Sequence, residues 1–206
     1  MQMHMNMKVI GLSIAALLVL ASCTATRTTA QWRDQNVDRR YARILVIGVS
    51  EQVILRRSFE DKLVAELQQR GVEATSSASM MPLDQKISRE TVKAAIEGKG
   101  FDGVLVTHMV GAREEQVYYP PTYYPLAIPH YRRYYPYYSH VYDYVYEPGY
   151  YDRYRVVRLE TNLYDTDTEN IVWSLQSDTV DSNAPQKVID SVIENTIEAL
   201  QAQRLI

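Results

Sequence analysis

The sequence lacks several features that would narrow its function. It has one cysteine in 206 residues, so it can form no internal disulfide and offers no cysteine cluster for zinc. Basic residues are in slight deficit, with 22 Lys and Arg against 25 Asp and Glu and a formal net charge of −3. This balance excludes a generic nucleic-acid binder, and it provides no basic surface for docking on anionic lipid.

The N-terminal apolar run is too short to span a bilayer, which takes about 20 residues. It covers Val9–Leu20, 12 residues that follow Lys8, and this is the length of a signal-peptide core. Leu20-Ala21-Ser22-Cys23 comes next and resembles the bacterial lipobox. The resemblance implies cleavage between Ser22 and Cys23, and lipid attachment at the Cys23 thiol.

Such an anchor makes the membrane the first expected partner, because several acyl chains give lasting attachment where one is marginal. Thr24 after the cysteine, where Asp would signal retention, implies by the same resemblance sorting to the outer membrane of a Gram-negative cell. We therefore expect the protein to be anchored in the outer membrane and to face the periplasm. The expected organisation is a signal peptide over 1–22, the lipidated Cys23 with a flexible tether over 23–40, and one domain over 41–206.

The domain begins with alternating strand and helix patterns. Apolar, β-branched runs at 41–49 and 103–110 predict buried strands, and a short strand is expected at 72–75. Apolar residues recur every four positions from Leu55 to Leu67, with Gly71 placed to end that helix. Ser88 is placed to cap a second helix carrying Val92, Ala95 and Ile96.

The last third predicts two strands and a helix. Residues 157–164 alternate in polarity, a turn follows at 165–170, and a return strand carries Ile171, Trp173 and Leu175. A terminal helix has an apolar stripe from Ile189 to Leu200. The sequence thus predicts an α/β (α+β) fold in the order β-α-β-α-β-(Tyr-rich insertion)-β-β-α. We expect a mixed, roughly five-stranded sheet with three helices packed mainly on one face.

The insertion, at 117–153, is the unusual segment. The stretch 118–154 holds 15 of the 17 tyrosines and six of the eight prolines. Three interpretations remain open: a loop or strand extension whose rings pack on the domain, a binding surface, or a site of self-association. Tyrosine offers large, stiff, amphipathic contact area, which suits a protein partner, and its ring can also stack on sugars. The candidate surface comprises Tyr118, Tyr119, Tyr123, Tyr124, Tyr134, Tyr135, Tyr137, Tyr138, Tyr142, Tyr144 and Tyr146.

No catalytic or metal-binding motif stands out. Asp165, Asp167 and Glu169 lack the glycine and terminal glutamate of a calcium loop and are better explained as turn residues. Ser50 and Ser58 have no nucleophile-elbow context. We expect a protein that is not an enzyme, with no metal and no cofactor.

The core segments carry a family resemblance. Ile44–Val49, Arg56–Asp61, Leu63–Gly71 and Gly103–Thr107 together resemble a family of small bacterial outer-membrane lipoproteins with no established catalytic residues. The order of elements also resembles that of envelope accessory lipoproteins, which assist curli secretion, exopolysaccharide export or peptidoglycan synthases. The resemblance implies a lipid-anchored periplasmic binding or assembly module, with an envelope protein or cell-wall glycan as its partner. An enzyme acting on envelope polymers is the third alternative.

Overall fold

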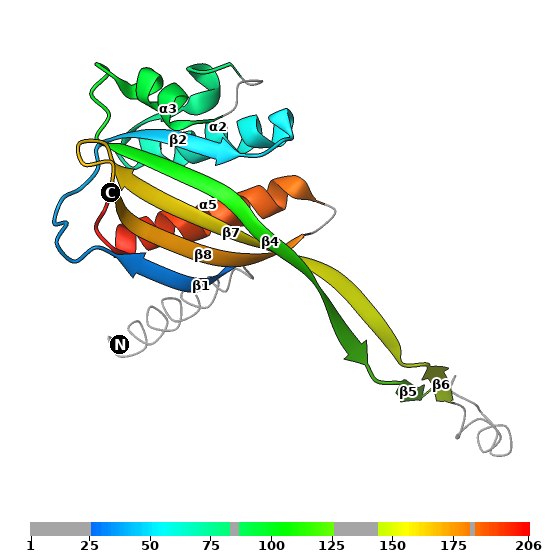
Figure 1. The fold of residues 1–206 in the computed structure, drawn as a ribbon. Coiled ribbons are helices and arrows are strands. Elements are labelled where there is room, and N and C mark those ends of the chain that lie inside the picture. Colours follow the sequence, from blue (N-terminus) through cyan, green and yellow to red (C-terminus); the bar gives the residue numbers. More distant parts are fainter. Residues whose placement is uncertain (1–25, 83–86, 126–143, 182–183) are drawn as a thin grey trace, which may run out of the picture.

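A computed structural model describes residues 26–82, 87–125, 144–181 and 184–206 (Figure 1). Six strands form one mixed sheet in the order β1-β8-β7-β4-β2-β3, and β5 and β6 form a separate two-stranded sheet. The strands of the large sheet are β1 (Thr26–Arg33), β2 (Arg43–Val49), β3 (Glu73–Ser76), β4 (Gly103–Tyr119), β7 (Tyr150–Asp165) and β8 (Ile171–Asp181). The small sheet pairs β5 (Thr122–Pro125) with β6 (Tyr144–Glu147), and the described helices are α2 (Val53–Gln69), the 3₁₀ helix η2 (Ser77–Ser79), α3 (Arg89–Ile96) and α5 (Pro185–Ala202).

The predicted α/β fold is confirmed. Strand β2 is parallel to both β3 and β4, as the β-α-β-α-β pattern requires, while β7 and β8 add antiparallel strands. Ser88 caps α3 by accepting a hydrogen bond from the Thr91 amide, and Gly71 ends the α2 region with a φ of +83°. The sheet has six strands where about five were expected, because β1 is an additional edge strand.

The core lies mainly between the sheet and two helices. Ile44 and Val46 of β2, Leu105 of β4 and Trp173 of β8 point to one face and pack with α2 and α5. The apolar stripe of α5 is buried there as predicted: Ile189, Val192, Ile193, Thr196, Ile197 and Leu200. Helix α3 covers part of the opposite face, over a smaller cluster that includes Leu45, Ile47 and Val104. Two of the three α-helices in the described residues thus share a face (Figure 1).

Residues 26–40 correct the expectation of a flexible tether. Thr26–Arg33 pairs antiparallel with β8, and the hydroxyls of Thr26 and Thr179 are 2.8 Å apart. The Asp34 amide then donates to the Val172 carbonyl, and Arg39 pairs with Asp165 at 3.1 Å. Strand β1 has no apolar alternation because only its first side chain is buried, so hydrophobic patterning could not reveal it.

Candidate functional site: an aromatic arm

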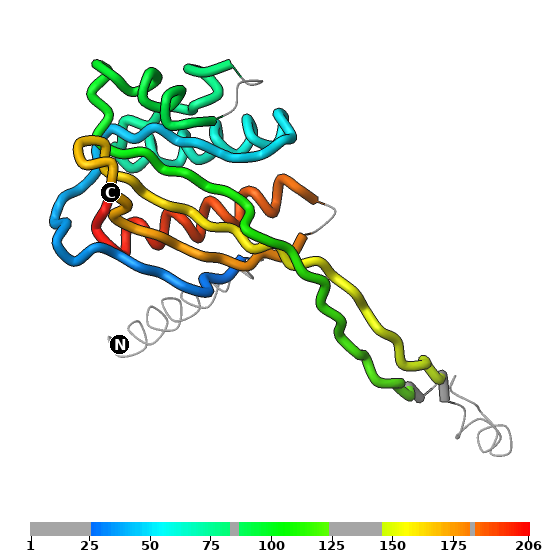
Figure 2. Tube along the Cα trace, in the orientation of Figure 1, coloured from blue at the N-terminus to red at the C-terminus, as the bar shows by residue number. Residues whose placement is uncertain are grey.

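The Tyr-rich segment forms a two-stranded arm that continues the central hairpin beyond the domain. Strand β2 accompanies β4 only as far as His108, and β8 accompanies β7 only from Arg155 onward. Beyond these points β4 and β7 pair with each other out to Tyr119 opposite Tyr150. We call residues 113–125 and 144–155 the arm. Figures 1 and 2 show it projecting from the domain and ending in β5 and β6.

A β-bulge marks the point where the arm leaves the sheet. The register between β4 and β7 shifts between Met109 and Gly111, so Val110 is an extra residue on β4. A bulge bends its strand and increases the local twist, which turns the hairpin away from the domain. The side chains of Met109 and Val110 are 54% and 44% exposed, so they add an apolar spot at the bend.

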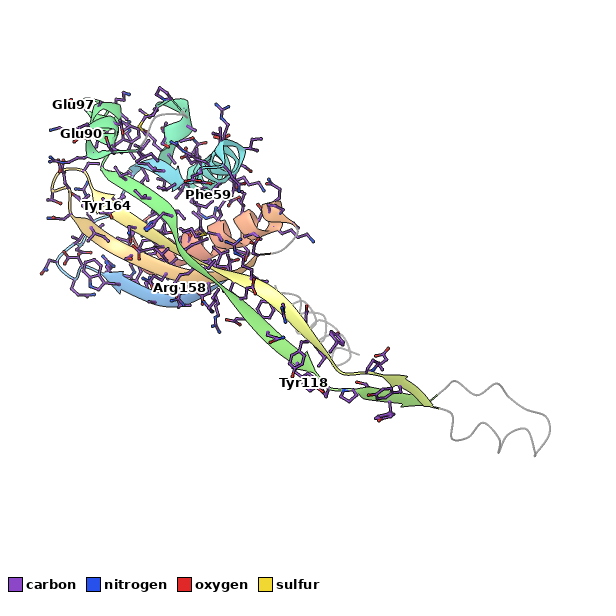
Figure 3. All side chains as sticks on the ribbon, turned by 45° about the vertical axis from the view of Figure 1, so that its right-hand side comes forward. Phe59, Glu90, Glu97, Tyr118, Arg158 and Tyr164 are labelled. Atoms are coloured by element: carbon purple, nitrogen blue, oxygen red, sulfur yellow. The ribbon has the colours of Figure 1, made fainter. Side chains whose placement is uncertain are left out.

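Tyrosine rings pair across the arm at three levels. Tyr118 and Tyr151 have ring centroids 4.8 Å apart, Tyr119 and Tyr150 5.0 Å, and Tyr123 and Tyr146 5.1 Å. The rings keep much of their surface open, with exposed fractions between 45% for Tyr119 and 64% for Tyr123. They therefore pack against each other and not on the domain, and Figure 3 shows Tyr118 well out along the arm.

The root of the arm is fixed by a buried carboxylate on β8. Asp178 accepts hydrogen bonds from Arg158 of β7, from Nε at 2.8 Å, and from Arg113 of the arm, from Nη2 at 2.8 Å. The Asp178 side chain is only 3% exposed. The Arg158 and Arg113 guanidinium groups hold the pKa of Asp178 well below its usual range. The cluster connects Arg113, at the base of the arm, to a buried residue of β8 (Arg158 is labelled in Figure 3).

A second cross-strand contact extends that cluster into the arm. The Tyr154 hydroxyl donates to Oε2 of Glu115 at 2.8 Å, and Nε of Arg113 donates to Oε1 of the same carboxylate at 2.9 Å. The Tyr154 hydrogen bond, followed by that of Arg113, lowers the pKa of Glu115. The hydrogen bond between Tyr154 and Glu115 also raises the pKa of Tyr154. The part of the arm nearest the domain, at Arg113 and Glu115, is therefore held by charge and hydrogen bonding. The part beyond it is held by the tyrosine ring pairs.

Gly149 lies in a tight position where β6 passes into β7. A Cβ added to it would meet the hydroxyl oxygen of Tyr118 at 2.7 Å and Cδ of Pro121 at 2.9 Å. Glycine thus lets the chain pass close to the first ring level and carry on into β5 and β6.

The structure describes only some of the tyrosines predicted to form the candidate binding surface. Tyr118, Tyr119, Tyr123 and Tyr146 form the ring pairs, while Tyr124 and Tyr144 lie on β5 and β6. The other predicted residues lie outside the described part of the chain: Ser22, Cys23, Tyr134, Tyr135, Tyr137, Tyr138 and Tyr142. Tyr150, Tyr151 and Tyr154 were not among the predicted surface residues, although their Tyr-rich context is the signal that could have found them.

Sequence reasoning also missed a buried polar cluster beside β2. Glu60 is fully buried, and its carboxylate accepts from Arg56 Nε at 3.0 Å and from the Gly48 amide at 2.8 Å. It also accepts from the hydroxyls of Ser76 and Ser77, each at 2.7 Å. The spacing of four residues between Arg56 and Glu60 on one helix was the available signal. The Arg56 contact lies within α2, and the others join α2 to the end of β2 and to the junction of β3 and η2. The cluster is therefore a structural one.

The acidic turn behaves as turn chemistry predicts. Oδ1 of Asp165 accepts from the amides of Asp167 and Thr168, at 3.1 and 2.9 Å. Its other oxygen receives the Tyr41 hydroxyl at 3.1 Å. Among the described residues, no group of three or more His, Cys, Asp or Glu side chains could hold a metal ion. Within that same part of the chain, every helix is too short or too polar to cross a membrane.

Comparison with known proteins finds similarity at the level of fold. The dodecameric PelC from Paraburkholderia phytofirmans is 14% identical, with a TM-score of 0.47 over 85% of this chain and 97% of that one. The lipoprotein GNA1162 from Neisseria meningitidis is 16% identical, with a TM-score of 0.39 over 79% of this chain and 96% of that one. No protein-family model and no curated protein sequence matches the chain. The similarity is therefore one of fold alone, and no family is assigned to the chain.

Proposed function

We propose that the protein is a lipid-anchored, non-catalytic binding or assembly module of the bacterial envelope, facing the periplasm from the outer membrane. The arm is its contact surface for a protein partner. One observation carries this proposal: the arm projects from the domain and pairs its rings with each other, which leaves six tyrosines 45–64% exposed. Exposed aromatic surface on a built element is typical of a binding site.

The arm suits a protein partner in its chemistry. Tyrosine contributes contact area at low entropic cost and a hydroxyl that can hydrogen-bond at the rim of an interface. Fixed cross-strand contacts at the root, from Arg113 to Asp178 and from Tyr154 to Glu115, hold the rings in place before binding. Preorganisation of this kind lowers the entropic cost of association.

The alternative function is binding of peptidoglycan or another polysaccharide. It is favoured by the Tyr119–Tyr150 pair, whose planes are within 16° of parallel and whose residues are 45% and 59% exposed, because flat exposed rings can stack on a sugar. An enzyme acting on envelope polymers would instead need a positioned acid, base or nucleophile. The buried carboxylates of Glu60 and Asp178 are both engaged by internal hydrogen bonds.

The test removes the arm without disturbing its root. Gln116 lies directly opposite Arg153, so residues 117–152 can be replaced by an Asn-Gly turn that closes the hairpin at that pair. A matched control keeps the full arm and replaces Tyr118, Tyr119, Tyr150 and Tyr151 with serine. All three proteins are incubated with detergent-solubilised envelope and with purified sacculi, and retained material is identified by mass spectrometry.

Capture of a defined protein by the native chain alone supports the assembly module. Saturable, arm-dependent retention on sacculi supports the glycan alternative. Equal capture by all three proteins contradicts both, because the binding site would then lie on the α/β domain.

A further inference from the structure

The arm and the expected lipid anchor belong to the same end of the sheet. Thr26, the first described residue, pairs with Thr179 of β8. Thr179 lies opposite Val157 of β7, and Val157 lies opposite Ala112 of β4. Thr26 is therefore level with Ala112, the residue just before the arm. Strand β1 runs from this level back along the domain, while the arm runs the other way (Figure 1).

The link to the anchor is much shorter than the arm. Cys23 precedes Thr26 by three residues, which span at most about 11 Å when fully extended. From Ala112 to Tyr119 the arm advances seven residues along β4, about 24 Å at the rise of an antiparallel strand. With a lipidated Cys23, the distance from Thr26 to the bilayer surface is therefore shorter than the distance from Thr26 to the second ring pair, Tyr119–Tyr150.

This geometry limits how the domain can sit on the membrane. The arm cannot point straight away from the bilayer, because the domain behind Thr26 is too long. Strand β1 alone extends seven residues from Thr26 to Arg33, about 24 Å, which exceeds the reach of the link. The bilayer must therefore lie beside the sheet or at the end from which the arm emerges.

The arm cannot cross the bilayer core either. In the part of the chain that the structure describes, no strand pairs with the outer edge of β4 beyond His108 or with that of β7 before Arg155. These edges carry backbone amide and carbonyl groups that would lose their water in hydrocarbon, at a cost of several kcal/mol per group. Charged side chains at Glu114, Asp152 and Arg153 add to that cost. The remaining orientation places the arm along the membrane surface.

We infer that the arm lies in the headgroup layer of the membrane that carries the anchor, with the pairs Tyr118–Tyr151 and Tyr119–Tyr150 seated at the lipid–water interface. Tyrosine is enriched at this depth in membrane proteins because its ring is apolar and its hydroxyl is polar. The arm has no basic excess, so rings and not charge make the contact. The inference rests on the proposed anchoring of Cys23, and it implies that a protein partner of the arm is itself at or in this membrane.

The test uses the mature acylated protein, which begins at Cys23, extracted from membranes and reconstituted into phosphatidylcholine vesicles. Trp32 is first replaced by phenylalanine, which leaves the fully buried Trp173 as the only tryptophan and as an unquenched reference. Tyr119→Trp is then added to this background. Lipids brominated near the top of the acyl chain quench tryptophan at the interface. The emission of the added tryptophan is expected to fall, because an aromatic ring at the interface lies beside the brominated carbons, and that of the W32F parent to stay unchanged.

Each outcome separates the inference from the function on which it rests. Protein that floats with the vesicles while the emission of the added tryptophan stays unquenched overturns the inference and leaves the anchoring intact. Protein that does not float overturns the anchoring, and the inference with it. Quenching that needs anionic lipid or disappears in high salt shows adsorption by charge, which contradicts contact through the rings. Tyr151→Trp, on the other strand of the first ring pair, repeats the test if Tyr119→Trp perturbs the arm.

Discussion

Tyr119 and Tyr150 stack face to face across the arm, with ring centroids 5.0 Å apart and planes inclined by 16°. They are the last directly opposed residues of the long β4–β7 ladder. Their contact lies outside the hydrophobic core, so the arm has a source of order that does not depend on the domain's interior. Stability of the arm and stability of the domain should therefore respond to different substitutions.

Tyr119→Ala should loosen the arm and spare the domain. Loss of an exposed cross-strand aromatic pair costs about 0.5 kcal/mol locally, which corresponds to roughly twofold faster amide exchange in the adjoining strands. Hydrogen exchange with mass spectrometry over residues 113–119 and 150–155 measures this effect. The melting temperature should not change, and a clear drop in it would show that the rings support the core.

Gly149→Ala should disturb the same region by crowding. The added methyl would stand 2.7 Å from the Tyr118 hydroxyl oxygen and 3.0 Å from the Tyr119 carbonyl oxygen, both closer than normal contact. Exchange should rise in β5, in β6 and at Tyr118, but not in β8. Gly111→Ala is the matched control, because nothing lies within 4 Å of a Cβ added there. Equal effects of the two substitutions would argue against crowding.

Asp178→Asn should weaken the protein in a pH-dependent way. The pKa of Asp178 is lowered in the folded state by Arg158 and Arg113, whereas an unfolded aspartate has a pKa of about 3.9. Its carboxylate therefore contributes stability that is fully present above about pH 4 and is lost as pH falls towards the folded pKa. Urea denaturation at a series of pH values should show a difference between native and D178N protein that shrinks below that point. Asp152→Asn, at an exposed arm position, should show no such trend.

Glu60→Ala should destabilise the domain far more than a surface carboxylate change. It leaves the buried Arg56 without its 3.0 Å partner and removes acceptors from the Gly48 amide and two serines. Breaking a buried ion pair from one side costs about 3–5 kcal/mol. Glu66→Gln is the control, since Glu66 pairs with Arg70 on the surface of the same helix. Chemical denaturation of both variants measures the contrast, and similar losses would contradict it.

Cys23→Ser should release the protein from membranes. Serine cannot form the thioether to lipid, so the variant loses the expected anchor. Fractionation of cells should move the variant from the membrane pellet to the soluble fraction. Continued tight pelleting of the variant would show that lipidation is not what attaches it.

Local sequence patterns predicted the elements that build the core. Trp173 and Leu105 are fully buried in the apolar runs that predicted their strands, and Ser88 begins its helix with a capping box. Strand β1 was missed because it is an edge strand whose stability comes from backbone pairing with β8, which leaves no apolar signature.

The position of the arm could be predicted from the sequence, but the pairing of its two strands could not. Its composition marked the tyrosines, yet the pairing of Tyr119 with Tyr150 depends on a register set by the whole β4–β7 ladder. The Val110 bulge has no sequence mark, because any residue can be the extra one. Asp178 reaches Arg113 across 65 positions in sequence, a relationship that only the folded sheet reveals.

The regular pairing of β4 and β7 beyond the Val110 bulge has a consequence for how this protein can vary. Because side chains alternate with a period of two, inserting two residues into each strand beyond Gln116 and Arg153 lengthens the arm without turning any core residue to the wrong face. Each such step adds about 7 Å. The reach of the protein can therefore change between related sequences while the domain that supports it stays the same.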